Sequence, residues 1–205
     1  MSLAAWLRDG LARFSAAVPP FILGETPALI LDVDITGVDA QRDRVTGIAL
    51  LPVSGTRFRL ADLDYLQLPP ADGAPADPAD FGRQFDRLLA ATGDVPIIVF
   101  NVNFVRHMLD RTLGALGLPR LGGRWLDVRA MLEGVYGKEM GQVESLASWQ
   151  QRLGVPVLAE HSAVADVFAT AQLFAILVGR CEELDLRTMD DVMDAEKSRR
   201  WLRGD

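Results

Sequence analysis

Two aspartates lie one residue apart in the apolar segment LILDVDITG, which begins at residue 29. The aliphatic residues predict a buried strand, and alternate side chains of a strand point to the same face. Asp32 and Asp34 would therefore lie side by side, where two like charges cannot both stay ionised without compensation. A divalent cation supplies that compensation, and oxygen ligands suit Mg²⁺ or Mn²⁺. The alternative interpretation is that the strand ends early and solvent covers both carboxylates.

Two further segments carry polar groups beside predicted apolar elements. In EHSAVADVFATAQLF, residues 160–174, His161 precedes a long helix and Asp166 falls in its first turns. In VFNVNFVRHML, residues 99–109, polar residues follow an apolar strand and open a helix. Each segment also has an ordinary interpretation. An early helical aspartate is favourable to the helix dipole, and His161 could be a loop residue.

The elements that must position these groups alternate along the chain. Apolar patterning predicts strands at 28–35, 44–53, 57–60, 95–100 and 124–128. Helices are expected at 2–16, 78–93, 104–116, 145–154 and 162–181. A short helix that ends at 136 and a further helix at the C-terminus are also expected. Asp77, Ser145 and the pair Thr188 and Asp191 are predicted helix caps. A β-meander followed by alternating helices and strands predicts an α/β fold of three layers with a mixed sheet.

Composition sets the remaining bounds. The 205 residues, 49% of them hydrophobic, suffice for one full domain, expected at 25–185 between an N-terminal segment at 1–24 and a tail at 186–205. The single cysteine, Cys181, lies in a hydrophobic helix, which favours packing and a reduced cytoplasmic setting. No apolar run approaches the roughly 20 residues of a membrane span, and the N-terminus lacks a secretory signal. The net charge of −7 argues against long contact with a nucleic-acid backbone but permits a small metal site that handles one phosphate.

The three polar segments together resemble the motifs of the DEDDh family of 3′–5′ exonucleases, which have a ribonuclease H-like fold. The first family motif, D-x-E-T-T/S-G, is matched by DVDITG at 32–37, and the second, H-N-x-x-F-D, by FNVNFV at 100–105. The third, H-x-A-x-x-D, is matched without a break by HSAVAD at 161–166. The resemblance spans about residues 25 to 180, and the order and separation of the motifs agree with the family.

The resemblance implies phosphodiester hydrolysis with two metal ions, Mg²⁺ or Mn²⁺, at the 3′ end of single-stranded nucleic acid or on a nucleotide. Asp32 would bridge both ions, and Asp34 and Asp166 would complete the ligands of the first. His161 would be the general base, and its place before a helix N-terminus disfavours the imidazolium form. Substrate contacts would come from the following residues: Ile35, Thr36, Gly37 and Asn101.

Three positions depart from the family motifs. Asp34 replaces a glutamate, which shortens the reach by about 1.5 Å. Val105 replaces the aspartate that supports the second ion, and Phe100 replaces a polar residue; these apolar side chains indicate that this side of the pocket is dry core. One hypothesis is therefore an exonuclease with a weakened site that holds one ion. Another is a catalytically inactive binding or regulatory module without a metal. In a third hypothesis, the terminal helices dock a protein partner or a second copy of the chain. The alternative is that these helices simply cover the edges of the sheet.

Overall fold

The computed structural model describes residues 21–70, 73–140, 143, 145–159 and 162–194, without the side chains at 94 and 138–140. The predicted helix at 2–16, the catalytic candidate His161 and the tail beyond 194 lie outside the described residues. Within the described part, residues 21–23 and 186–194 contribute Phe21, Leu23, Met189 and Val192 to the core. A bridge between Ile22 and Thr188 joins these two segments.

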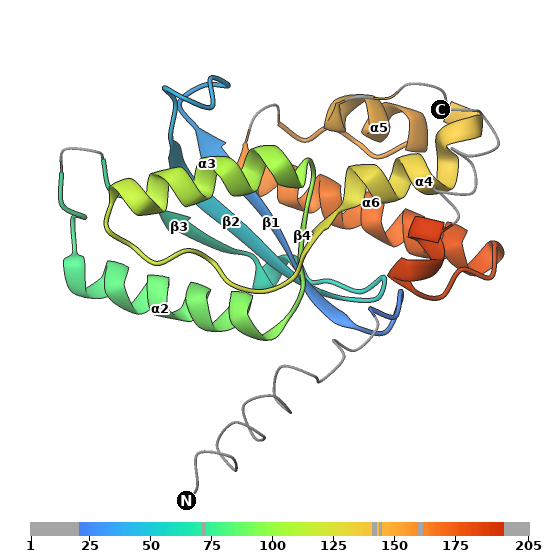
Figure 1. Ribbon diagram of the computed structural model, residues 1–205, viewed down its shortest axis with the longest axis horizontal. Helices are drawn as coiled ribbons and strands as arrows, with labels where there is room; N and C mark the ends of the chain where they lie inside the picture. Colours follow the sequence, from blue (N-terminus) through green and yellow to red (C-terminus); the bar gives the residue numbers. More distant parts are fainter. Residues whose placement is uncertain (1–20, 71–72, 141–142, 144, 160–161, 195–205) are drawn as a thin grey trace, which may run out of the picture.

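A five-stranded mixed sheet forms the centre of the fold (Figure 1). Its strands are β1 (Pro27–Ile35), β2 (Val45–Ser54), β3 (Asp64–Gln67), β4 (Ile97–Val99) and β5 (Trp125–Asp127). Their order is β3-β2-β1-β4-β5. The first three strands form an antiparallel meander, and β4 and β5 add parallel to β1. The prediction of a mixed sheet is confirmed.

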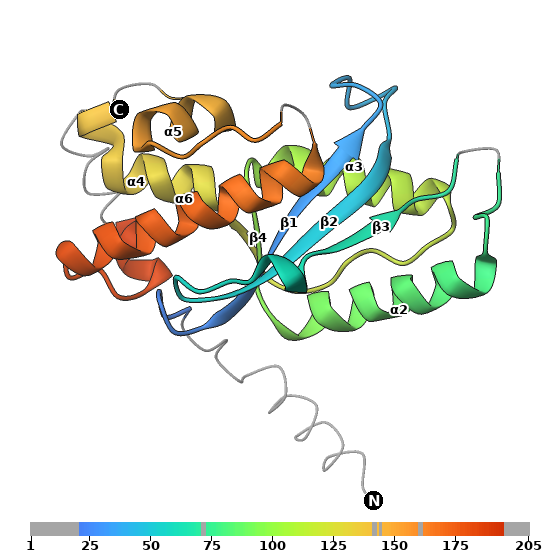
Figure 2. The ribbon, with the colours of Figure 1, turned by 180° about the vertical axis from the view of Figure 1, so that it is seen from behind.

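Helices cover both faces of the sheet (Figures 1 and 2). They are α2 (Pro78–Asp94), α3 (Val102–Ala115), α4 (Val128–Met140), α5 (Leu146–Leu153) and α6 (Ala163–Glu183), with a 3-10 turn at Leu60–Asp62. Buried side chains of α4, α5 and α6 form a first core cluster with one face of β1. Those of α2 and α3 form a second cluster with the other face. The predicted three-layer α/β architecture is confirmed.

The two clusters divide β1 by alternate residues. Ala28 and Ile30 belong to the first cluster, whereas Leu29, Leu31 and Val33 belong to the second. This alternation follows from the pleat of the strand. It places the even-numbered positions of β1, Asp32 and Asp34 among them, on the face that α6 covers.

Capping residues begin the helices where the sequence predicts them. The Asp77 carboxylate accepts hydrogen bonds from two backbone N–H groups of α2, both at 3.0 Å. Ser145 Oγ accepts from the Ser148 N–H at 3.1 Å. Thr188 and Asp191 exchange reciprocal side-chain bonds of 2.7 and 3.2 Å, as a capping box requires.

The predicted strand at 57–60 is wrong. Arg57 pairs only with Ser54, by backbone bonds of 2.9 and 3.1 Å that close the turn after β2. The chain then forms the 3-10 turn, which the bidentate Arg59–Asp62 pair holds and whose Leu60 is 58% exposed. The third strand therefore begins only at Asp64.

Helix α6 differs from the expectation that no apolar segment is long enough to span a membrane. By length and composition it could cross a membrane, with a mean hydropathy of 1.5 over an 18-residue window. Half of that window is buried inside the protein, where α6 packs against β1 and β2. A core helix that is apolar on most of its sides accounts for this composition.

Candidate functional site

Asp32 and Asp34 lie near the C-terminal end of β1, both half-buried. They pair with Ala49 and Gly47 of β2, so that only small residues flank them on that side. The register shifts immediately after Asp34, where β1 leaves its regular pairing. The predicted strand therefore continues past both aspartates, and the alternative of an early strand end is wrong.

Asp166 approaches this strand from the first turn of α6, where its N–H donates to the Ser162 carbonyl at 2.8 Å. The pKa of Asp32 is raised well above its usual range, first because burial removes water from the carboxylate and next because Asp166 carries a like charge. Asp34 adds a smaller repulsion, and the Val33 N–H offsets part of these effects. Two elements far apart in sequence thus bring Asp32 and Asp166 into electrostatic contact.

Asp34 is held by donors on both of its carboxylate oxygens. Its Oδ1 accepts from the Ala163 N–H at 2.8 Å, and its Oδ2 accepts from the Tyr65 hydroxyl at 2.8 Å. Burial, followed by the hydrogen bond to Asp34 and its negative charge, raises the pKa of Tyr65 to about 12, so the phenol remains a donor at neutral pH. Sequence reasoning missed Tyr65, because nothing local marks a contact across 31 residues.

The bond from Ala163 makes Asp34 a cap for α6. Ser162 occupies the N-cap position but makes no side-chain capping bond. A carboxylate next to the first N–H groups of a helix satisfies one of them and complements the dipole. Asp34 performs this role from a position 129 residues earlier in the chain.

These contacts limit which residues could hold a metal ion. Within the described residues, no group of three or more histidine, cysteine, aspartate or glutamate side chains is arranged to hold one. Both oxygens of Asp34 already accept hydrogen bonds, whereas Asp32 and Asp166 repel each other, and a cation between these two carboxylates would relieve that repulsion. Two carboxylates fit one hard divalent ion such as Mg²⁺ or Mn²⁺, because Mg²⁺ is usually bound by one or two carboxylates and keeps several of its own waters.

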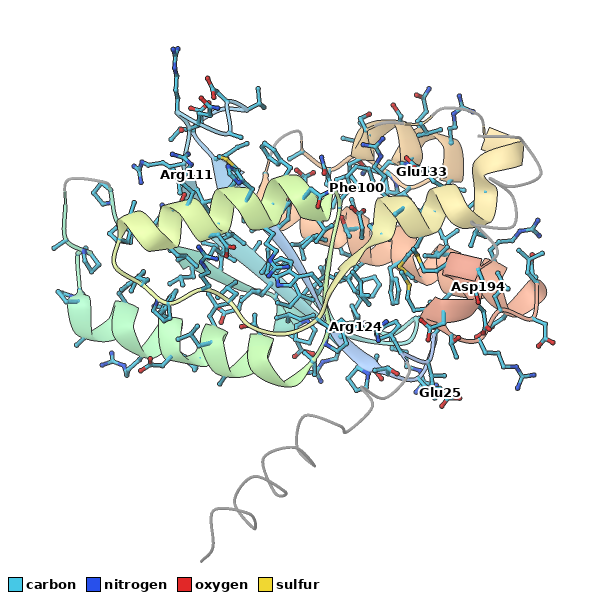
Figure 3. The ribbon with its side chains drawn as sticks, in the orientation of Figure 1. Glu25, Phe100, Arg111, Arg124, Glu133 and Asp194 are labelled. Carbon is cyan, nitrogen blue, oxygen red and sulfur yellow. The ribbon has the colours of Figure 1, made fainter. Side chains whose placement is uncertain are left out.

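The two apolar departures of the second motif lie on different sides of the sheet. Phe100 lies where β4 leads into α3 (Figure 3) and packs against the first cluster, which lies on the same face of the sheet as the even-numbered residues of β1. Val105 is 3% exposed and belongs to the second cluster with Leu31 and Val33. The interpretation that Val105 is dry core agrees with this burial. His107, on the same helix, is exposed.

Asp127 at the end of β5 is a second residue that sequence reasoning missed. Its carboxylate accepts from the N–H groups of Asn101 and Val102 at the start of α3 and from those of Arg129 and Ala130 at the start of α4, at 2.8–3.3 Å. It therefore caps two helices. An aspartate between a strand and a helix is a local N-cap signal that could have identified it.

The proposed substrate-contacting residues surround the end of β1. The Thr36 hydroxyl donates to Asp43 at 2.9 Å and accepts from the Arg44 N–H at 3.1 Å, so it closes the loop between β1 and β2. A side chain at Gly37 would overlap the Asp43 carboxylate. Ile35 packs against the second cluster. Their contacts with a substrate remain a prediction.

Asn101 occupies a left-handed backbone conformation, with φ of 66° and ψ of 72°. This conformation is rare outside glycine, although asparagine tolerates it better than most residues. It turns the chain sharply from β4 into α3, and the N–H of Asn101 points to Asp127 at 3.3 Å. Asn101 lies in the same β4–α3 connection as Phe100; its side-chain role stays a prediction.

Solved structures identify the fold. The chain matches Exonuclease I of E. coli in complex with a dT13 oligonucleotide, with a TM-score of 0.60 and 15% identity over 78% of this chain and 42% of that one. It also matches Exonuclease X in complex with 5′ overhanging duplex DNA, with a TM-score of 0.55 and 16% identity over 82% of this chain and 99% of that one. The described chain is thus an α/β protein with the ribonuclease H-like fold of these exonucleases, and it spans less than half the length of Exonuclease I.

Sequence comparisons add no closer relationship. No protein-family model matches the chain, and no curated protein matches it. A zinc-bound form of the complex of E. coli Exonuclease I with single-stranded DNA matches with a TM-score of 0.59 and 16% identity, over 78% of this chain and 42% of that one. At these identities the likeness establishes the fold, and the activity of this chain has to be argued from its own site.

Proposed function

We propose that this chain is a metal-dependent 3′–5′ exonuclease of weak activity, which acts on the 3′ end of single-stranded nucleic acid. One Mg²⁺ or Mn²⁺ ion would be held by Asp32 and Asp166. The pairing of these two carboxylates carries the proposal, since two like charges in a poorly hydrated position are costly without a cation. The Exonuclease I structures solved with dT13 and dA16 oligonucleotides support single-stranded nucleic acid as the substrate class.

Each candidate residue has a defined part in this proposal. A bound divalent ion supplies Lewis-acid chemistry at a phosphoryl oxygen. His161, just before α6, would accept the proton of the attacking water, and the helix N-terminus would keep its imidazole neutral beforehand. Main-chain groups from Ile35 to Gly37 and the amide of Asn101 would position the terminal nucleotide. The short Asp34 and the apolar Val105 limit the site to one ion, which accounts for weak activity.

A strand-shortening assay tests this proposal. The full chain is incubated with 5′-labelled single-stranded DNA and RNA oligonucleotides and Mn²⁺, and the products are resolved by length. We expect stepwise loss from the 3′ end, and a phosphorothioate 3′ linkage should slow it. Asp166→Ala should reduce the rate to that of a reaction without enzyme.

Asp86→Ala is the matched control, because Asp86 is exposed on α2, a helix of the opposite sheet face. It should shorten the oligonucleotides like the wild type. Lack of any wild-type shortening at high protein concentration would reject the hydrolytic function. Equal rates for the wild type and Asp166→Ala would point to a contaminating nuclease.

A catalytically inactive binding module is the second candidate. Two observations favour it: both oxygens of Asp34 are engaged, and the Val105 side chain is part of the core. In that case the chain would bind the same oligonucleotides without shortening them. Binding would then be unaffected by chelators and by Asp166→Ala, which separates it from the metal-dependent function.

A further inference from the structure

We infer that Tyr65 is a positioning residue of the proposed metal site, through its hydrogen bond to Asp34. This inference rests on the proposed function and extends it to a residue outside all three sequence motifs. The Tyr65 hydroxyl donates to Asp34 Oδ2 at 2.8 Å, from the edge strand β3 to the central strand β1. No motif at 32–37, 100–105 or 161–166 includes β3.

The sheet leaves room for the Tyr65 side chain to cross β2 and reach Asp34. Gly47 of β2 lies directly opposite Asp34, between the two partners. A Cβ atom at Gly47 would overlap the hydroxyl and ring of Tyr65. Glycine weakens the interior of a strand, and its presence there often marks a close approach of another group. The phenol therefore crosses β2 only because position 47 has no side chain.

The same carboxylate also fixes the start of α6. Asp34 Oδ1 accepts from the Ala163 N–H at 2.8 Å, so one side chain joins β3, β1 and the first residue of the helix. Asp166 lies three residues further along, in the first turn. When Tyr65 fixes the orientation of Asp34, it also fixes where the helix brings Asp166 relative to Asp32.

Asp34 is not one of the two proposed ligands, but it holds the start of α6 and thereby the position of Asp166. Loss of contacts that orient metal ligands typically costs about 10–100-fold in metal affinity or activity. Aspartate in place of the family's glutamate has less freedom to recover a displaced position. We therefore expect Tyr65→Phe to weaken Mn²⁺ binding by about 10–100-fold. The ring remains in this variant, so its packing against the first cluster is preserved.

Calorimetric titration of the full-length protein with Mn²⁺ measures the affinity without any substrate. Gly47→Ala displaces the phenol while it leaves Tyr65 and Asp34 chemically intact, and it should weaken binding to a similar extent. The double variant should bind no more weakly than either single variant, since both changes break the same hydrogen bond. Tyr136→Phe is the control, because this other tyrosine packs against Trp149 between α4 and α5.

The outcomes separate this inference from the proposed function. If the wild type and Tyr65→Phe bind Mn²⁺ with equal affinity, or Tyr65→Phe binds more tightly, the inference is overturned and the metal site stands. If the wild type binds no Mn²⁺, the proposed function fails and the inference fails with it. A purely structural role would lower the melting temperature of Tyr65→Phe and leave the Mn²⁺ affinity of the folded protein unchanged, and that result would also overturn it.

Discussion

Val105→Asp tests whether the second-motif position still belongs to the site. The substitution introduces the aspartate that the resembled exonuclease motif has at this position, and a site that lacked only this ligand would gain activity. In the structure, however, Val105 is 3% exposed and belongs to the cluster of Leu31, Val33 and Met108. We therefore expect the introduced carboxyl group to be buried in apolar surroundings, away from the face that carries Asp32.

The expected loss of stability has two parts. Removing the buried valine side chain from the core costs about 1.5–2 kcal/mol. Burial raises a carboxyl pKa of about 3.9 by about 3–5 units, so the group folds protonated, which costs about 4 kcal/mol at pH 7. The sum of about 5–6 kcal/mol approaches the whole stability of many domains. The melting temperature should fall by about 10–24 °C, or the protein should not fold at pH 7.

The dependence on pH identifies the buried carboxyl. Because its folded pKa would lie above the unfolded one, the folded state binds more protons, and stability falls as the pH rises from about 4 to 7. Val105→Asn removes the same apolar contact without a titrating group and serves as the control. The two variants should have similar stability at pH 4 and diverge toward pH 7, as followed by urea unfolding. Similar stability at both pH values, together with faster Mn²⁺-dependent shortening by Val105→Asp, would refute the assignment of Val105 to dry core.

Two further substitutions test the site and its support. Asp32→Asn should abolish Mn²⁺ binding yet stabilise the metal-free protein by about 0.5–2 kcal/mol at pH 7, as thermal unfolding can show. The pKa of Asp32 is raised in the folded state, so this gain should disappear as the pH falls below about 4; a loss of stability at pH 7 would contradict the repulsion with Asp166. Asp127→Ala removes the caps of α3 and α4 and should cost about 1–4 kcal/mol. Asp127→Asn keeps one carbonyl oxygen and should cost less, whereas equal losses would show that the capping bonds contribute little.

Local patterns predicted most of the fold. The alternation in β1, the apolar run of β4 and the caps at Asp77 and Ser145 are local signals, and each element lies within a few residues of its expected position. The missed position of β3 has a physical reason as well. Four residues of an edge strand carry little apolar pattern, and backbone hydrogen bonds close the nearby 3-10 turn, beside the exposed Arg59–Asp62 pair.

The sequence motifs predicted which residues form the candidate site but not the contacts that hold them. Spacing placed Asp32 and Asp34 on one face and Asp166 early in a helix, and the structure brings Asp32 and Asp166 together. The hydrogen bonds that occupy Asp34 come from Tyr65 and from Ala163, 31 and 129 residues away. Contacts of that separation are set by tertiary packing, which no local pattern contains.

The positions that differ from the exonuclease motifs resembled by the sequence are accommodated in different ways. Val105 packs among apolar side chains, and Asp34 has a donor for each oxygen, so both positions are satisfied without a metal. Asp32 is different, because burial and the charge of Asp166 both oppose its ionisation. A fold with no use for a cation would be more stable with a neutral residue at position 32. The unfavourable pairing of Asp32 with Asp166 is therefore the strongest physical reason to look for an ion there, because an added positive charge would make the pair of ionised carboxylates favourable.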